Sequence, residues 1–221
     1  MSRTSAVICA AGKGSRMGSV IPKQYMMAGK MPVLGLTVQA FEKSSVDEII
    51  IVCPAGDEDY VRSHITEPYG FTKVKTVTAG GSERYHSVYN GLQKADCDIV
   101  LIHDGARPYI KPEVIDEMTA VCESCGAVIA GMPVKDTIKI ADPEGFVAST
   151  TDRALTWQIQ TPQCFVYSQI MEAYEKILPF ADRMMITDDA MVYEAAFPDK
   201  KIKLYKAGYE NIKITTPDDL R

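Results

Sequence analysis

The sequence predicts one α/β domain built on a mostly parallel, Rossmann-like sheet flanked by helices. Two patterns predict this fold: short apolar runs typical of buried strands, and amphipathic segments of helical period that alternate with them. No repeat or low-complexity linker divides the 221 residues, and one large α/β domain can hold a chain of this length. We therefore expect a single domain over residues 1–221.

Six apolar runs have the length and composition of buried strands, which are typically four to eight residues long. They are Ala6–Ala10, Glu48–Val52, Val74–Thr78, Ile99–His103, Ala127–Pro133 and Lys203–Ala207. Because the segments between them are long enough for helices, consecutive strands are expected to run parallel.

Helices are predicted between the strands from apolar residues at helical spacing. Their apolar stripes are Leu34, Val38 and Phe41, then Val88, Leu92 and Ala95, and later Ile170, Tyr174 and Ile177. Pro112 suits the first turn of a further helix, because proline lacks an N–H that this turn would leave unpaired. Ser168 is expected to cap the helix that carries Ile170.

One stretch interrupts the alternation of strands and helices. Asp136–Ile140 and Phe146–Thr151 predict two short strands around the turn Asp142-Pro-Glu-Gly145. A hairpin with so few apolar side chains cannot bury much on its own. Residues of about 134–153 should therefore form an arm that packs on the sheet edge or reaches a second subunit.

Composition and charge exclude several classes of protein. The net charge of −5 is spread without a basic block, so nucleic acid is not expected as a partner. No apolar stretch approaches the roughly 20 residues that a membrane helix needs. Met1-Ser-Arg-Thr4 leads directly into a strand-like run rather than a signal sequence, so we expect a cytoplasmic protein.

The six cysteines are expected to be thiols in that compartment, and one pair has a motif spacing, Cys122-Glu-Ser-Cys125. A lone pair of this spacing is compatible with a redox site or with half of a zinc site, but no second pair follows. Cys122 and Cys125 continue an apolar helical stripe with Val114, Ile115 and Met118. We therefore expect both thiols to face the core.

A glycine-rich turn, Ala10-Ala-Gly-Lys-Gly-Ser-Arg-Met-Gly18, follows the first predicted strand. Open α/β sheets bind ligands at the carboxyl ends of their strands, where this turn lies. Glycines there let backbone N–H groups approach phosphate oxygens. The turn matches neither a P-loop nor a dinucleotide fingerprint. Arg16 and Lys23 place two cations where a polyphosphate would lie, which favours a binding loop over a plain connecting turn.

Two further segments have the same character. Gly80-Gly-Ser-Glu-Arg84 follows a strand and opens a helix, whose N-terminus favours anions. Asp104 ends another strand, three residues before Arg107. A carboxylate among phosphate-binding groups suits Mg²⁺, although a structural ion pair with Arg107 is the alternative. No nucleophile elbow accompanies His103, so a hydrolase is not expected.

The ordered set of motifs resembles the 2-C-methyl-D-erythritol 4-phosphate cytidylyltransferase family of the non-mevalonate isoprenoid pathway. The resemblance covers nearly the whole chain and rests on these segments: Ala10-Ala-Gly-x-Gly-x-Arg-Met-Gly18, Pro22-Lys-Gln-Tyr25, Gly80-Gly-x-x-Arg-x-x-Ser-Val88, His103-Asp-x-Ala-Arg-Pro108, Pro133-Val-Lys-Asp-Thr137, Asp152-Arg153, Gln160-Thr-Pro-Gln163, Thr187-Asp-Asp189 and Asn211-Ile-Lys-Ile-Thr215. Gly105 and Thr156 depart mildly from the family pattern, and members usually continue through a short helix past the position of Arg221.

The resemblance implies transfer of CMP from CTP to a polyol phosphate by a homodimeric, Mg²⁺-dependent nucleotidyltransferase domain. It assigns catalysis to Arg16, Lys23 and Lys213, and Mg²⁺ to Asp104. The implied CTP-binding residues are Ala10, Ala11, Gly12, Gly14, Gly81, Ser82, Ser87, Asp104 and Ala106. The implied substrate-binding residues are Thr137 and Arg153, reaching across a dimer, and Arg107, Thr161 and Thr187.

Three other functions compete with this interpretation. The nearest is D-ribitol-5-phosphate cytidylyltransferase, which shares the nucleotide and the chemistry. A catalytically silent CTP-binding module is a second, although the retention of Arg16, Lys23, Asp104, Arg153 and Lys213 argues against it. A dehydrogenase is disfavoured because the acidic residue expected about 20 positions after the first glycine turn is missing.

Overall fold

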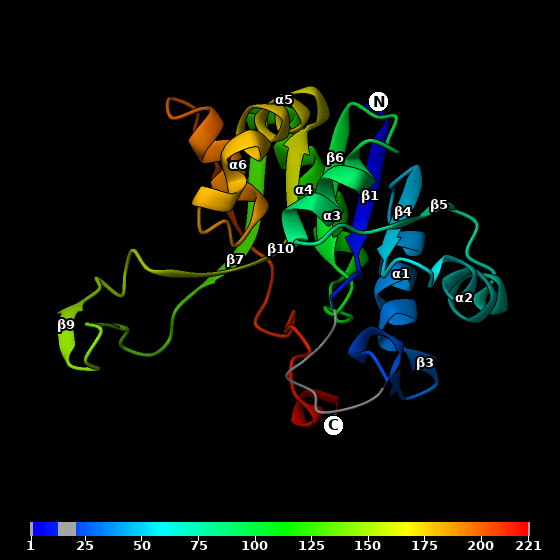
Figure 1. Cartoon of the computed structure of the whole chain (residues 1–221), viewed down its shortest axis with the longest axis horizontal. Coiled ribbons are helices and arrows are strands. Elements are labelled where there is room, and N and C mark those ends of the chain that lie inside the picture. The colour runs from blue at the N-terminus through cyan, green and yellow to red at the C-terminus, as the bar shows by residue number, and fades with distance from the viewer. Residues whose placement is uncertain (1, 13–20, 221) are drawn as a thin grey trace.

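The computed structural model describes residues 2–12 and 21–220, which contain a seven-stranded sheet of order β11-β7-β10-β6-β1-β4-β5 (Figure 1). Its strands are β1 (Thr4–Cys9), β4 (Glu48–Cys53), β5 (Val74–Ala79), β6 (Ile99–Asp104), β7 (Ala127–Pro133), β10 (Trp157–Val166) and β11 (Lys203–Lys206). Neighbouring strands are parallel, except that β10 runs antiparallel to both β6 and β7. The predicted mostly parallel sheet and its six apolar strands are confirmed, while β10 was not predicted.

The central strands are buried on both faces because helices cover each side. Ala6 and Ile8 of β1 enter one apolar core, whereas Val7 between them enters the other. This alternation follows from the two-residue period of a strand. It explains why these strands are almost continuously apolar, as strands covered on both faces are.

Helices α1 (Val33–Lys43) and α4 (Pro112–Cys125) cover one face, and α3 (Arg84–Leu92), α5 (Tyr167–Ile177) and α6 (Asp189–Ala196) cover the other. Pro112 begins α4 as predicted. The cap predicted at Ser168 is wrong, because α5 already begins at Tyr167 and Val166 occupies the N-cap position. Within the described residues, every helix is too short or too polar to span a membrane.

Short elements connect these layers. They are β2 (Met27–Ala28), β3 (Met31–Pro32), α2 (Glu58–Val61), a π-helical turn over Arg62–Thr66, and 3-10 turns over Lys23–Tyr25, Glu67–Tyr69, Leu178–Arg183 and Pro217–Leu220.

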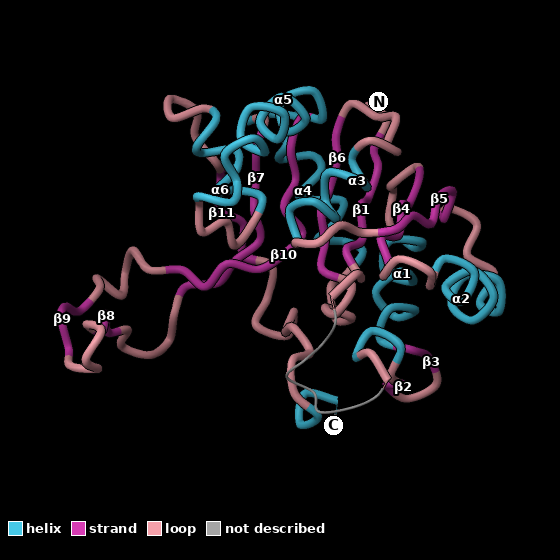
Figure 2. Tube along the Cα trace, viewed as in Figure 1, coloured by secondary structure: helices cyan, strands magenta, loops and turns pink. Residues whose placement is uncertain are grey.

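The predicted hairpin is present as β8 (Lys139–Ala141) and β9 (Val147–Thr150), which pair antiparallel. It extends away from the sheet at the end of a long excursion between β7 and β10 (Figure 2). All residues of both strands are exposed, and Phe146 and Val147 expose 72% and 63% of their surface. The arm therefore leaves apolar surface exposed instead of packing it on its own sheet.

The parallel strands bring three predicted segments to one edge of the sheet. β1, β5 and β6 all run in the same direction, since each is linked to the next through parallel pairs. Their carboxyl ends lead into Ala10, Gly80 and Gly105 respectively. Open α/β sheets bind ligands at this edge.

Candidate active site

A cavity of about 410 Å³ opens at the carboxyl edge of β1, β5 and β6. It collects ten of the residues that sequence analysis assigned to the site: Ala10, Ala11, Gly12, Lys23, Gly81, Ser82, Ser87, Asp104, Ala106 and Lys213. The predicted Gly14 and Arg16 lie outside the described residues. Cys9, Gln24, Glu83, Arg84 and Thr215 also line the cavity and were not assigned.

Hydrogen bonds from Gln24 hold the start of the first glycine turn where it leaves β1. The Gln24 amide donates to the main-chain oxygens of Ala10 (2.8 Å) and Gly12 (3.1 Å). Lys23, its neighbour, donates to the Ile214 carbonyl at 2.8 Å. The short turn Lys23–Tyr25 therefore holds the start of the first glycine turn and also brings a cation to the segment that carries Lys213.

The second glycine turn is shaped by close packing. A Cβ on Gly80 would lie 2.5 Å from the Ala11 Cβ, so the two glycine turns touch directly at this glycine. The Gly81 N–H donates to Ser87 Oγ (3.0 Å), whose hydroxyl donates to the Glu83 carbonyl (3.1 Å). Ser87 thus fixes the turn from the first turns of α3.

Asp104 lies at the floor of the cavity among three cations. Its Oδ2 is 2.7 Å from Lys213 Nζ and 3.6 Å from Arg107 Nε, and its Oδ1 is 3.5 Å from Arg84 Nε. Burial opposes ionisation, but the charges of Arg84 and Lys213 outweigh it and hold the pKa of this carboxyl well below its usual range. Asp104 is therefore a carboxylate wherever the protein is folded at ordinary pH.

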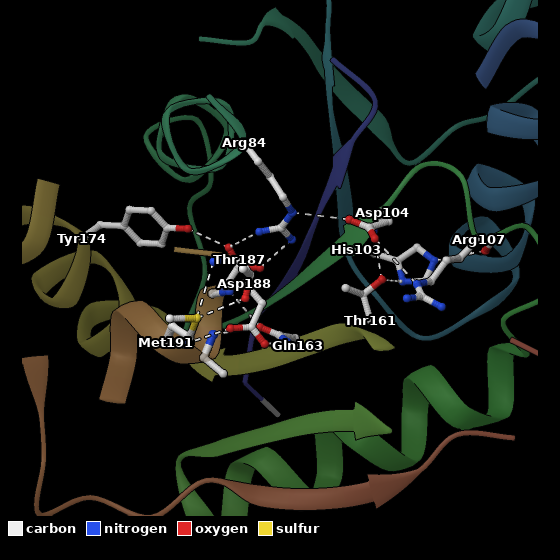
Figure 3. A network of polar contacts seen from close by, with 12 residues as sticks. Arg84, His103, Asp104, Arg107, Thr161, Gln163, Tyr174, Thr187, Asp188 and Met191 are labelled. Atoms are coloured by element: carbon white, nitrogen blue, oxygen red, sulfur yellow. Dashed lines mark hydrogen bonds and ion pairs between the residues drawn. The ribbon is translucent and has the colours of Figure 1, made fainter. Parts of the chain in front are cut away.

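Arg84 lines the cavity, and sequence analysis gave it no role of its own although it lies in the second glycine turn. Its two terminal nitrogens donate to the Asp189 carboxylate at 2.9 and 2.8 Å, and Tyr174 donates to the same carboxylate at 2.6 Å. Figure 3 shows the Arg84 side chain reaching from α3 towards Tyr174 on one side and Asp104 on the other. Because Asp189 is fully buried, this pair holds Arg84 in one orientation at the wall of the cavity.

Thr161 and His103 hold the backbone of Asp104 from below. His103 Nε2 lies 3.2 Å from the Arg107 carbonyl, which only accepts, so this nitrogen must carry the hydrogen. His103 Nδ1 then accepts from the Thr161 hydroxyl (3.1 Å), and Thr161 Oγ1 accepts from the Asp104 N–H (3.0 Å). Each hydrogen bond in this chain therefore has a fixed donor and acceptor. His103 must be neutral, because its Nδ1 accepts a hydrogen bond.

Because His103 is buried and neutral, we expect the free energy of unfolding to fall measurably in acid. Burial lowers the pKa of His103 to about 4 from its usual 6.5, so the unfolded chain binds a proton first as the pH falls. The resulting stability is complete above pH 6.5 and is lost on acidification towards pH 4. It accounts for about 2 kcal/mol of the difference between about pH 7.5 and about pH 5. Urea unfolding of His103→Gln should show that much less pH dependence than the wild type, and an unchanged dependence would contradict the assignment.

The remaining substrate-side predictions fall outside the wall of the cavity. Arg107 donates to the Asn211 carbonyl (2.9 Å), Thr161 is buried beneath Asp104, and the exposed Thr187 contacts Met191 Sδ at 3.1 Å. Thr137 and Arg153 are exposed on the arm. Among the described residues, none of these five lines the cavity of its own chain.

The cysteines are all free thiols, as predicted, but the placement of one is wrong. Cys122 is buried, whereas Cys125 is exposed because α4 ends there and Gly126 turns the chain with a φ of 85°. No group of three metal-ligating side chains occurs among the described residues, which gives the pair no zinc partners. In the cavity, burial raises the pKa of Cys9 to about 12, so its thiol is not a nucleophile.

Glycine turns, fixed cations and one ionised carboxylate at the carboxyl edge of a parallel sheet define an α/β protein that binds nucleotide phosphates. Residues 4–221 match the family model described as 2-C-methyl-D-erythritol 4-phosphate cytidylyltransferase. The chain belongs to this family.

Individual relatives agree with the family model. Enzymes named 2-C-methyl-D-erythritol 4-phosphate cytidylyltransferase from Alkaliphilus oremlandii and Lachnoclostridium phytofermentans are 46% and 47% identical to the chain, over all of it and over 93% and 94% of the relatives. The chain is similar to the crystal structure of 4-diphosphocytidyl-2C-methyl-D-erythritol synthase from Anaerococcus prevotii, with a TM-score of 0.85 and 35% identity over 99% of this chain and 92% of that one. The cytidylyltransferase structure from Thermus thermophilus gives a TM-score of 0.76 and 27% identity, over 99% and 95% of the two chains.

Proposed function

We propose that the protein transfers CMP from CTP to 2-C-methyl-D-erythritol 4-phosphate, giving 4-diphosphocytidyl-2-C-methyl-D-erythritol and pyrophosphate in isoprenoid precursor biosynthesis. Beside membership of the family, the observation that carries this proposal is the convergence of Lys23, Lys213 and Asp104 with two glycine turns in one cavity. Residues 1–221 would act as one nucleotidyltransferase domain in the cytoplasm.

The reaction needs no protein nucleophile. An oxygen of the substrate phosphate forms a bond to the α-phosphorus of CTP, and the bond from that phosphorus to the β-phosphate oxygen breaks, so pyrophosphate leaves. In transfers of this kind the protein positions the groups and neutralises charge. Lys23 and Lys213, with Arg16, would stabilise the negative charge on the reacting α-phosphate and the leaving group. The backbone at Gly81 and Ser82 would distinguish cytosine from uracil.

Asp104 suits a magnesium ion. Mg²⁺ commonly takes one or two carboxylates, with phosphate oxygens and water completing its six ligands. Asp104 offers one ionised carboxylate to the cavity, whose lining also includes Glu83, whereas Asp189 is fully buried and bonded to Arg84. When bound there, Mg²⁺ would draw charge from the phosphates. Asp104 would hold the ion, and Lys213, 2.7 Å from Asp104, would contact phosphate beside it.

The arm would complete the site of a second subunit in a homodimer. Thr137 and Arg153 are exposed at the two ends of the arm, which extends away from the sheet, and neither lines the cavity of its own chain. The apolar Phe146 and Val147 between them are largely exposed. In the proposed dimer, Arg153 of one subunit binds the methylerythritol phosphate in the cavity of the other. In a two-fold symmetric dimer, each arm would reach the other subunit's cavity in the same way.

Pyrophosphate release tests the proposed function directly. The full chain with CTP and Mg²⁺ should release pyrophosphate rapidly with methylerythritol phosphate and much more slowly with ribitol 5-phosphate. Preference for ribitol 5-phosphate would replace the substrate, and CTP binding without turnover on either would identify a silent binding module.

Arg153→Ala should raise KM for the sugar phosphate by about tenfold while changing kcat little, because it removes a charge that binds the substrate away from the reacting phosphorus. Mixing Arg153→Ala with Lys23→Ala tests whether the site is shared. Half of the randomly formed dimers would contain one intact site, so about a quarter of the wild-type activity should return at low substrate. No recovery on mixing, with subunit exchange verified, would show that each chain uses its own arm.

A further inference from the structure

Residues 207–216 form an irregular segment that follows β11 and carries Lys213 to the cavity; we call it the Lys213 segment. After Lys213 the segment is fixed by Ile214, whose N–H donates to the Ala106 carbonyl (2.8 Å) and whose carbonyl accepts from Lys23 (2.8 Å). Before Lys213 the segment is fixed by Asn211.

Asn211 is fully buried and bonded through both its side chain and its main chain. Its Nδ2 donates to the Thr161 carbonyl (2.8 Å) and to Gln160 Oε1 (3.0 Å) on β10. Its carbonyl accepts from Arg107 Nη1 at 2.9 Å. Asn211 therefore joins the Lys213 segment to β10 and to the loop that follows β6.

The orientation of this amide is set by its surroundings. The Thr161 carbonyl only accepts, so the NH₂ of Asn211 must face it. Gln160 donates its own NH₂ to the Gly208 carbonyl (3.2 Å), which turns its oxygen towards Asn211. The three hydrogen bonds donated by the two amides thus fit one arrangement, in which the buried Oδ1 of Asn211 has no hydrogen-bond partner among the described residues. Because a buried amide costs free energy unless it is bonded, this arrangement locks the position of the segment.

The same short stretch of β10 also holds Asp104. Thr161 accepts the Asp104 N–H through its hydroxyl, and it accepts Asn211 through its carbonyl. Thr161 of β10 therefore helps to hold the main chain on both sides of the 2.7 Å ion pair between Lys213 and Asp104. A lysine is long and flexible, so its ammonium stays in place only if its main chain does.

We propose that Asn211 is a positioning residue: it fixes the main chain two residues before Lys213 and so holds the Lys213 ammonium at Asp104, where the triphosphate binds. The effect on turnover rests on the proposed function, whereas the placement of Lys213 does not. A leucine at position 211 would fill a similar volume but could not donate to β10.

Lysine acylation followed by mass spectrometry tests the placement without any turnover. An ammonium held against a carboxylate is shielded from the reagent, and Lys213 Nζ lies 2.7 Å from Asp104 Oδ2. In Asn211→Leu, where the segment would no longer be fixed to β10, Lys213 should react about threefold faster or more, relative to the exposed Lys203 on β11 in the same chain. An unchanged relative rate in the folded variant would overturn the proposal.

Turnover distinguishes positioning from a general structural role. Asn211→Leu should lower kcat by about tenfold or more, but should cost less than about twofold on a Lys213→Ala background, since residues that act through one another are not additive. Full additivity of the two changes would overturn the proposal. If the wild type releases no pyrophosphate, the proposed function fails, and the acylation result still decides the role of Asn211.

Two more variants complete the test. Tyr209→Phe is the control, because it removes a different hydrogen bond of the Lys213 segment, from the exposed Tyr209 hydroxyl to the Pro133 carbonyl (2.9 Å). It should leave the Lys213 acylation rate and kcat near those of the wild type. Gln160→Leu leaves the bond from Asn211 to Thr161 in place and should show the same changes as Asn211→Leu at smaller size. It decides the question if circular dichroism shows that Asn211→Leu does not fold.

Discussion

Replacing Lys213 with alanine is expected to lower kcat/KM for CTP and methylerythritol phosphate by about a hundredfold or more, the range found when a group that stabilises transition-state charge is removed. The physical reason is position. Lys213 Nζ lies 2.7 Å from Asp104 in the cavity, so bound triphosphate would meet a cation already held at its reacting end. The same size of loss is expected for Lys23→Ala, whose ammonium approaches the neighbouring Ile214 carbonyl.

The loss should come from charge and not from unfolding. The Lys213 side chain is 36% exposed, and Asp104 keeps Arg84 and Arg107 as partners when Lys213 is removed. The free energy of urea unfolding of Lys213→Ala should therefore differ from that of the wild type by about 1 kcal/mol or less. Lys111→Ala is a matched control. It breaks a lysine–glutamate pair of 2.6 Å on the surface, and Lys111 does not line the cavity. Near-wild-type turnover in Lys213→Ala would remove Lys213 from catalysis.

Sequence patterns predicted the parallel part of the sheet because strands buried on both faces leave continuous apolar runs. They did not predict β10, whose sequence contains Pro162 and several polar residues. The structure explains that composition. Gln160, Thr161 and Gln163 are buried because they bond Asn211, Asp104 and Asp189 rather than water. The sequence of β10 therefore reflects the polar contacts that it makes to the site, and it lacks the apolar pattern by which a buried strand is predicted.

The site was predictable where its residues follow strand ends, and not where they meet across the fold. Asp104 and the glycine turns have local signatures at the carboxyl ends of parallel strands. Arg84 and Asp189 have none for their pairing, since 105 positions separate them and α3 and α6 bring them together. The error at Cys125 is also local: helical periodicity does not state where a helix ends, and the last turn of α4 leaves the core.

Arg84→Met is expected to give the largest loss of stability of any single change discussed for this protein, about 3–5 kcal/mol of unfolding free energy. Asp189 is 0% exposed, and of the hydrogen bonds that its carboxylate accepts from the described residues, only that from the Tyr174 hydroxyl would remain after Arg84 is removed. A buried carboxylate without a countercharge is destabilising because neither water nor a cation replaces the lost partner. Urea unfolding near neutral pH measures the loss, and a change below about 1 kcal/mol would contradict the assigned pair.

A second substitution, at Asp189, tests why Arg84→Met lowers the stability. If the uncompensated charge is the cause, Asp189→Asn on the Arg84→Met background should recover about half or more of the lost stability, because a neutral amide can be buried at lower cost than a carboxylate. If lost packing of the long Arg84 side chain is the cause instead, the second change should recover nothing and the two losses should add. The double variant would still lack the fixed guanidinium 3.5 Å from Asp104, so its stability should return without its full affinity for CTP. That separation would assign Asp189 to holding Arg84, and Arg84 itself to the nucleotide cavity.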